Sequence, residues 1–357
     1  MTEAPDAARW FERAPSAWDA LVEHDVAAGP AHRSGFVDAL AATTPGATAG
    51  YLIVGPEHEP AGGMPVLIMR RAGFESIHAL PHLLPGTPLA RDGQHERVDH
   101  ACAAALASLL ATRRAIGGEW VVARGKGRSV AVLERVAGET RSMERAIVDL
   151  DHGIEVALRR VDRHARQEMA VARRRGVEVA EAPEALEHAH ALYASQARAW
   201  HGHRPLPIEL ARRLLGNDSA GVPLARLYVA RDARGILSAV QVLVGAHEWF
   251  AWWSGSRAEA RRRSAFSVLM WHLAEEAARH GARRFNAGAS AQSASVEAFK
   301  RSLGARTESV GVRWITPTHA SSVGRALFAI QRWSRSARAR GTPEAGFERA
   351  PDMERSP

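Results

Sequence analysis

Lysine is almost absent from this 357-residue chain, although the chain is rich in cations. Only Lys126 and Lys300 are lysines among the 47 basic residues. A lysine carries a compact charge on a flexible stem, whereas the guanidinium of arginine is a planar fork. Lys300 is therefore a candidate for a contact that arginine serves poorly, such as polarising a reacting carbonyl or holding one phosphate. Chance retention of two lysines is the alternative.

Two aromatic side chains are candidates for the same chemistry. Phe299 directly precedes Lys300 and could stack on a nucleobase, a contact worth about 1–3 kcal/mol per base. Trp252 and Trp253 lie in the segment HEWFAWWSGS, which is typical of a strand. Alternation along a strand predicts that one of this pair faces inward, and Trp252 is our candidate for lining a cleft. Core packing is the alternative for Phe299 and for both tryptophans.

Three consecutive arginines precede a predicted helix. Arg261, Arg262 and Arg263 are followed by Ser264, and the apolar spacing predicts a helix from about 264 to 280. Cations at a helix start oppose the helix dipole, so solvent or a bound anion must offset them. We interpret these four residues as candidates for binding the phosphates of a donor molecule. A solvated arginine face is the alternative.

Two further segments combine helical spacing with many arginines. In 156–179 the alanines, Val161 and Met169 recur on one face, while Arg166 and other arginines form a positive face up to a C-cap at Gly176. The pattern of residues 319–340 predicts a basic amphipathic helix. We expect this helix to pack on its own protein, and contact with RNA or lipid head groups is the alternative. Arg166 is a further candidate for donor binding.

Composition limits the class of protein. The net charge is +8 and the pI is about 10.7. This balance favours polyanionic partners such as RNA, nucleotide phosphates or an anionic membrane face, but arginine-rich coding gives the same balance. The single cysteine, Cys102, excludes an intramolecular disulfide and is expected to be a buried thiol. Neither a signal peptide nor a run of about 20 apolar residues is visible, so we expect a soluble cytoplasmic protein.

Strand and helix patterns alternate in both halves of the chain. The first half predicts strands at 49–55, 61–71, 119–125 and 129–135 and a helix at 96–116. The second half predicts three β segments within 225–256, then a helix, a strand at 282–289, a short helix at 295–304 and a strand at 309–315. This order predicts an α/β protein with two related domains, each a mixed sheet flanked by helices. The expected divisions are 1–150, 151–318, the basic helix 319–340 and a disordered tail 341–357.

Several motifs in the second half resemble the FemAB-like acyltransferases of the GNAT superfamily. That family has a helix ending in Gly, a strand ending in an Asp-or-Asn/Gly/Ser loop, and a Phe-Lys pair followed by Gly. The matching stretches are WHLAEEAARHG (271–281), RFNAGAS (284–290), AFK (298–300) and LG (303–304). A stretch at 166–177 is similar to the helix that follows the family's first domain. The resemblance spans about 30–315.

The resemblance implies twin GNAT domains and transfer of an acyl group to an amine of a small-molecule or peptide acceptor, such as a cell-wall precursor or a natural product. It places Phe299 and Lys300 at the donor or acceptor channel, and Asn286 at the Asp-or-Asn position. Members of the Fem branch use aminoacyl-tRNA, and other relatives use acyl-CoA. GNAT enzymes bind acyl-CoA with a glycine-bearing loop at a helix start, but Arg261-Arg-Arg-Ser264-Ala-Phe266 has no glycine. We therefore favour aminoacyl-tRNA as donor.

Two other readings stay open beside aminoacyl transfer. One is a CoA-dependent N-acetyltransferase of the same superfamily, and the other is a non-catalytic relative that binds RNA or a membrane through its basic faces. No metal is expected, because the two His-x-His motifs lack partners at ligand spacing. Lys126 lies in RGKGRS, which is typical of a basic turn and lacks the pattern of a phosphate loop.

Overall fold

The computed structural model describes residues 7–123, 130–199, 204–218, 221–290 and 293–316. In chain order the strands are β1 (Ala8–Phe11), β2 (Ala47–Val54), β3 (Gly62–Arg71), β4 (Phe74–His78), β5 (Leu89–Ala90), β6 (Gly118–Ala123), β7 (Gly138–Asp149), β8 (Glu178–Glu181), β9 (Ala225–Asp232), β10 (Gly235–Leu243), β11 (Glu248–Ser256), β12 (Arg284–Ala289) and β13 (Arg306–Ile315).

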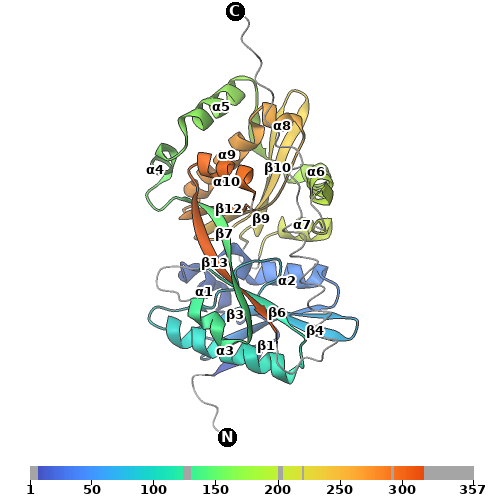
Figure 1. The fold of residues 1–357 in the computed structure, drawn as a ribbon, viewed down its shortest axis with the longest axis vertical. Coiled ribbons are helices and arrows are strands. Elements are labelled where there is room, and N and C mark those ends of the chain that lie inside the picture. The colour runs from blue at the N-terminus through green and yellow to red at the C-terminus, as the bar shows by residue number, and fades with distance from the viewer. Residues whose placement is uncertain (1–6, 124–129, 200–203, 219–220, 291–292, 317–357) are drawn as a thin grey trace, which may run out of the picture.

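Ten α-helices and three 3₁₀ helices of the described residues flank these strands (Figure 1). The α-helices are α1 (Trp18–His24), α2 (Ser34–Thr43), α3 (His95–Thr112), α4 (Ile154–Arg159), α5 (Arg163–Arg174), α6 (Leu186–Ala199), α7 (Ile208–Leu214), α8 (Glu259–Arg262), α9 (Ala265–Arg279) and α10 (Ala294–Ser302). The 3₁₀ helices are η1 (Pro30–His32), η2 (Val130–Arg135) and η3 (Pro183–Ala185).

One mixed sheet joins the described strands in the order β1-β2-β3-β4-β6-β13-β7-β12-β11-β10-β9-β8, with β5 beside β3. Only the pairs β4–β6 and β11–β12 are parallel among these neighbours. Helices cover both faces of each half, so the predicted α/β class, a mixed sheet flanked by helices, is confirmed.

In the first half, alternation along β2 sends neighbouring side chains to opposite cores. Tyr51 and Ile53 pack with α1 and α2, whereas Leu52 and Val54 pack with α3. Cys102 belongs to the α3 core and is fully buried, which confirms the expected buried thiol. Because both faces are covered, β2 and β3 are apolar almost throughout.

In the second half, α4, α5 and α9 pack on one face of the sheet and α6 and α7 on the other. Leu269 and Leu273 of α9 are fully buried against this sheet. The helix predicted over 156–179 is two helices, since the turn between α4 and α5 is fixed by a hydrogen bond from Asp162 N to Ser302 O (2.9 Å). Gly176 has a φ of 79°, as expected for a residue just after a helix.

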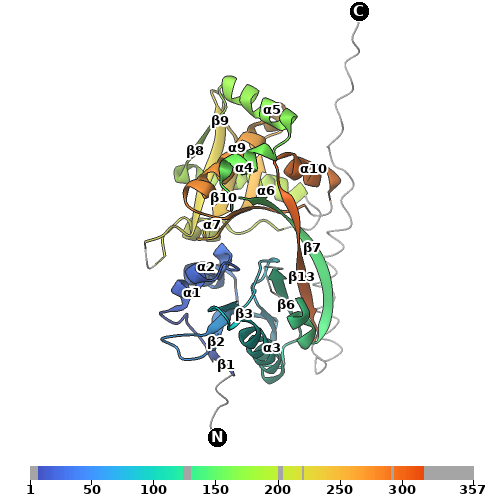
Figure 2. The same cartoon turned by 90° about the vertical axis from the view of Figure 1, so that its left-hand side faces the viewer.

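Strands β7 and β13 run through both halves (Figures 1 and 2). β13 pairs with β7 from Arg306↔Ile147 to Ile315↔Gly138, and its residues 310–315 also pair with β6. The end of β7 pairs with β12. The last described strand therefore lies between two strands that are far earlier in the chain, and the division near residue 150 stays a prediction.

One predicted element differs in type. Residues 129–135 were expected to form a strand, but 130–135 form η2. Leu133 and Val136, three residues apart, are both buried against α3, a spacing that suits a 3₁₀ turn. The predicted helix 319–340, the tail 341–357 and Lys126 lie outside the described residues.

Candidate active site around Lys300

Lys300 is a buried lysine at the inner face of α10. Its side chain is 8% exposed, and its Nζ donates hydrogen bonds to the carbonyl oxygens of Gly288 (2.9 Å) and Ala289 (2.8 Å). Burial disfavours the charged form and lowers the pKa of Lys300 to about 8. An ammonium has three N–H donors, so two carbonyl contacts leave one donor for another ligand.

The turn that holds Lys300 depends on a glycine and an asparagine. Gly288 has a φ of 79°, a conformation that L side chains rarely adopt. The side chain of Asn286 accepts a hydrogen bond from Gly288 N (2.9 Å), which fixes the turn at the end of β12. The sequence favours this turn because Asn286, whose side-chain amide is short, lies two positions before Gly288.

α10 begins at a serine cap. Ser293 is the N-cap residue, and its hydroxyl accepts a hydrogen bond from Val296 N. The helix directs Lys300 back towards the end of β12 and Phe299 towards α9. The Phe299 ring lies 5.6 Å from that of Phe266 at an interplanar angle of 26°. Phe299 therefore packs partly buried on the second-half core.

A cluster of buried charges lies beside the turn. Arg145 Nη2 donates to Glu308 Oε1 (2.6 Å), and its Nη1 lies 3.8 Å from Glu248 Oε1. Glu248 also contacts Arg284 Nη2 at 3.4 Å. Burial alone would lower the pKa of Arg145, but Glu248 and Glu308 raise it above its ordinary value. Both charge signs are thus present in this low-dielectric region.

Lys300 lines a small pocket that opens next to this cluster. Its lining residues are Glu144, Arg145, Ala146, Ser290, Glu297, Lys300, Arg301, Ala305 and Thr307. Five of these side chains carry charge in their usual ionisation states, three positive and two negative. The pocket suits a polar or anionic group more than an apolar one.

Strands β11 and β12 separate next to Lys300. They pair in parallel only at Glu248↔Arg284, Trp249↔Phe285 and Phe250↔Asn286, while β11 continues to Ser256. Gly288 lies in the opening: an added Cβ there would be 3.6 Å from Ala251 O and 3.8 Å from Lys300 Nζ. Beside Lys300, the facing edges of β11 and β12 are therefore not paired with each other or with another described strand.

The geometry can be compared with known proteins. No curated protein sequence matches this chain. Residues 157–301, from α4 to α10, match the family described as "Acetyltransferase (GNAT) domain". A crystal structure of FemX shares the fold with a TM-score of 0.68 over 90% of this chain and 99% of that one, at 11% identity. The chain therefore shares the FemX fold, and its second half matches a GNAT acetyltransferase domain.

Two further solved structures share this fold. One is a conserved protein from Bacteroides thetaiotaomicron, with a TM-score of 0.55, 8% identity and coverage of 87% of this chain and 100% of that one. The other is the C-terminal DUF2156 domain of an Agrobacterium fabrum protein assigned as a lysylphosphatidylglycerol synthetase, with a TM-score of 0.51, 13% identity and coverage of 76% and 85%. The GNAT resemblance read from the sequence is confirmed at the level of the fold.

In the GNAT fold the predicted phosphate-binding arginines lie between β11 and α9. Arg261 and Arg262 are exposed on α8, whereas Arg263 pairs with Asp232 at 3.2 Å. Ser264 precedes α9 in the left-handed region, with a φ of 49°, and its side chain caps no helical N–H. These four residues are consecutive from the end of α8 to the start of α9, but Arg263 is already partly neutralised.

Arg166 lies on a different helix, α5. Its side chain is exposed, and no ion-pair partner for it is present among the described residues. On the same helix Arg173 pairs with Glu275 at 3.7 Å. The buried face of α5, with Ala165 and Met169, packs on the core as predicted.

The tryptophan pair does not alternate. Gln241 pairs with Trp253 and Val242 with Ala251, so Trp252 is the extra residue of a β-bulge. Both rings pack with the α6–α7 core, so the expectation that only one faces inward is wrong. Trp252 also meets Phe36 of the first half, with ring centroids 5.5 Å apart. It lies where the two halves touch.

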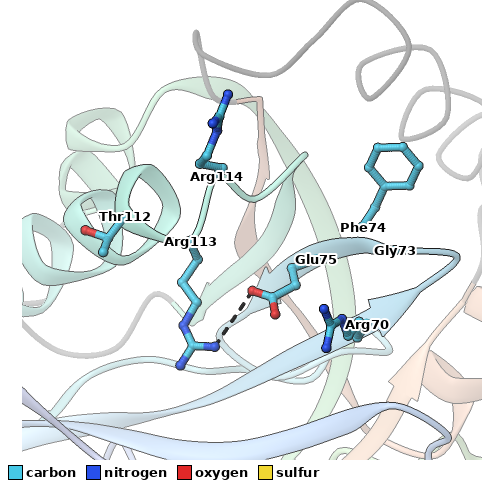
Figure 3. Close-up of a pocket in the computed structure, with 7 residues that line it drawn as sticks. All are labelled: Arg70, Gly73, Phe74, Glu75, Thr112, Arg113 and Arg114. Carbon is cyan, nitrogen blue, oxygen red and sulfur yellow. Dashed lines mark ion pairs between the residues drawn. The ribbon is translucent and has the colours of Figure 1, made fainter.

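A larger pocket, of about 430 Å³, lies in the first half at the end of α3 and the β3–β4 turn (Figure 3). Arg70, Arg113 and Arg114 line it together with Phe74 and Glu75. Arg113 Nη1 lies 3.8 Å from Glu75 Oε2. None of the predicted site residues lines this pocket.

The described residues contain no group of three or more His, Cys, Asp or Glu side chains placed to hold a metal ion. In the same residues, no helix has the length and apolar character needed to cross a membrane.

Sequence reasoning missed the roles of Arg145, Glu308 and His32. Arg145 and Glu308 are 163 positions apart and meet only because β13 pairs with β7. His32 is fully buried in η1, with Nε2 3.0 Å from Thr87 O, and burial lowers its pKa. The sequence marks Glu248 only as a conceivable general base in a predicted turn, whereas the structure makes it the first residue of β11.

Proposed function

We propose that this GNAT-fold chain is an acyltransferase that passes an aminoacyl group from aminoacyl-tRNA to an amine of a small-molecule or peptide acceptor. The observation that carries the proposal is the position of Lys300, buried at the opening between β11 and β12 with one N–H donor that has no partner among the described residues. This lysine occupies the place of the Phe-Lys pair that the sequence resemblance indicates. Such transfer draws on charged tRNA and would take place in the cytoplasm.

The reaction needs alignment of the amine with the carbonyl and stabilisation of the oxyanion. An aminoacyl ester is already activated, so no protein nucleophile is required. The third donor of Lys300 can stabilise the carbonyl oxygen as it gains negative charge. A cation in a dry site is worth more to that oxygen than the same cation in water.

Exposed arginines support the choice of tRNA. Arg166, Arg261 and Arg262 have solvent-exposed side chains on α5 and α8, and both helices belong to the half that contains Lys300. Such positive surfaces bind the phosphates of a nucleic-acid backbone. Phe299 is the candidate for stacking on a base, although its ring already packs on Phe266.

Acyl-CoA is the second candidate donor, and one observation favours it. The opening between β11 and β12 leaves strand edges that could pair with the amide groups of an extended arm, in the manner of an added strand. The loop at 261–266 argues against acyl-CoA, because no glycine there lets the backbone approach a pyrophosphate.

A transfer assay separates these donors. Purified protein is incubated with a library of amines and either tRNA charged with ¹⁴C-labelled amino acids or ¹⁴C-acetyl-CoA, and products are identified by mass spectrometry. Labelled amide from charged tRNA alone supports the proposal, and product from acetyl-CoA alone replaces it with the second candidate. If neither donor yields product while RNA still binds in a gel-shift assay, the chain is a non-catalytic binding protein.

A further inference from the structure

The turn at the end of β12 that accepts the hydrogen bonds of Lys300 is fixed in turn by Asn286 and Glu248. Four hydrogen bonds connect Glu248 to Lys300 through Asn286 and this turn. Asn286 Nδ2 donates to Glu248 Oε1 (3.0 Å), and Asn286 Oδ1 accepts from Gly288 N (2.9 Å). Gly288 O and Ala289 O then accept from Lys300 Nζ at 2.9 and 2.8 Å.

We infer that Asn286, oriented by Glu248, is a positioning residue that sets the place of Lys300 Nζ in the opening between β11 and β12. The consequence for acyl transfer rests on the proposed function, but the placement of Lys300 does not. Among the described residues Asn286 makes no hydrogen bond to Lys300, so it acts on Nζ through the Gly288 turn.

The chemistry of the two partners fixes the orientation of the amide. A carboxylate only accepts hydrogen bonds and a backbone N–H only donates them. The NH₂ of Asn286 must therefore face Glu248 and its oxygen must face Gly288 N. The flipped amide would oppose two acceptors at Glu248 and two donors at Gly288, so one rotamer satisfies both contacts.

Burial makes this orientation costly to lose. Asn286 is 2% exposed and Glu248 is 3% exposed, so water cannot readily replace a lost partner. An unsatisfied buried polar group costs about 1–3 kcal/mol. Aspartate, which the sequence family also uses at this position, would here place a second carboxylate 3.0 Å from Glu248 and repel it.

Glu248 also connects this network to the first half of the molecule. A Cβ added at Gly29 would lie 3.8 Å from Glu248 Oε1, so the backbone before η1 packs against the carboxylate. Arg145 and Arg284 flank the same carboxylate from β7 and β12. Glu248 is thus restrained from three elements and can serve as the fixed end of the series.

The scarcity of lysine gives a direct test. Protein labelled with ¹³Cε-lysine has two side-chain signals, from Lys126 and Lys300, and the variant Lys126→Arg assigns them. The pKa of Lys300 in the wild type is about 8, because burial lowers it. In Asn286→Ala the turn loosens and water reaches Nζ, so we expect this pKa to rise by about one pH unit or more. Glu248→Gln keeps a hydrogen-bond acceptor for Asn286 and should leave the pKa of Lys300 near the wild-type value.

A second variant carries the test if Asn286→Ala does not fold. A Cβ at Gly288 meets no atom closer than 3.6 Å, so Gly288→Ala strains only the backbone, whose φ is 79°. The matched control is Gly281→Ala, because Gly281 has the same φ of 79° and open space around an added Cβ. Gly288→Ala should raise the pKa of Lys300, and Gly281→Ala should leave it unchanged.

Kinetics add a readout that a purely structural role would not move. In an active preparation, Asn286→Ala should lower kcat by about 10–100-fold with KM changed only a few-fold, as expected for misplacing a group that acts in the transition state. The inference is wrong if folded Asn286→Ala and Gly288→Ala both titrate Lys300 like the wild type. Failure to find any transfer would contradict the proposed function but not the positioning role of Asn286, since the NMR titration needs no substrate.

Discussion

Arg145 Nη2 lies 2.6 Å from Glu308 Oε1, and these two side chains join the two long strands that run through both halves. Arg145 is on β7 and is 5% exposed, while Glu308 is on β13 and is 9% exposed. The pair lies beside Glu248 and lines the pocket of Lys300 through Arg145. The charged side chains around the candidate site therefore also help to fix the pairing register of β7 and β13.

Replacing Arg145 should be costly for stability. In Arg145→Met, Glu248 and Glu308 lose a buried cation, and breaking a buried pair costs about 3–5 kcal/mol. The control is Arg141→Met on the same strand, whose pair with Glu139 at 2.8 Å is about half exposed and should cost under about 1 kcal/mol. Urea unfolding measures both. Equal losses in the two variants would contradict a buried, coupled cluster.

Removing the partner acid tests the same cluster from β13. Glu308→Leu alone should destabilise the protein, because the ion pairs of Arg145 among the described residues are then reduced to the 3.8 Å contact with Glu248. The double variant Arg145→Met/Glu308→Leu should lose clearly less than the sum of the two single variants. Additive losses in a double-mutant cycle would show that the two side chains act independently.

Lys300 should make stability depend on pH in the alkaline range. Its folded pKa is about 8 against an ordinary value of 10.5. Between these values the unfolded chain binds a proton that the folded chain does not, so stability rises with pH. Burying the charged ammonium lowers the unfolding free energy fully below pH 8. As the pH rises to 10.5 this loss is relieved, and the unfolding free energy increases by on the order of 2–3 kcal/mol.

The comparison with Lys300→Met isolates this effect, because other titrating groups cancel in the difference. Between pH 7 and pH 10 the wild type should gain stability relative to Lys300→Met. A difference in unfolding free energy that stays constant with pH would mean that Lys300 keeps an ordinary pKa.

For transfer activity, Lys300→Arg separates charge from shape. A guanidinium is too large and too rigid to keep both carbonyl contacts and still present a donor to the opening. We expect Lys300→Arg and Lys300→Met to lose at least about 100-fold in kcat, the range seen when one oxyanion donor is removed. Donor binding, followed by fluorescence anisotropy of labelled tRNA, should change little. An active Lys300→Arg enzyme would remove any special role for lysine.

Ser264 offers a change that should stabilise the protein. Its φ of 49° suits glycine, and its hydroxyl caps no helical N–H. Ser264→Gly should therefore raise stability by about 0.5–1 kcal/mol in thermal unfolding, because relief of the left-handed backbone strain outweighs the added chain entropy. It also places a glycine at the start of α9. Tighter binding of acetyl-CoA by Ser264→Gly, measured by calorimetry, would favour the acyl-CoA reading over tRNA.

Local patterns in the sequence predicted most elements, and long-range pairing decided the rest. The apolar spacing of α9 and the strand pattern of β12 are local signals, and both elements lie where the sequence predicted them. The bulge at Trp252 depends on how β10 pairs with β11, which no spacing within β11 encodes. Arg145 meets Glu308 only through sheet order.

The position of β13 constrains the order in which the molecule can be completed during synthesis. Residues 306–315 fill the space between β6 and β7, so a nascent chain that has not yet reached them exposes two strand edges in the middle of its sheet. Open edges of this kind are templates for pairing with other chains. The first half can collapse early, but its sheet is completed only after almost all of the second half has been synthesised, and such long-range pairing favours slow folding.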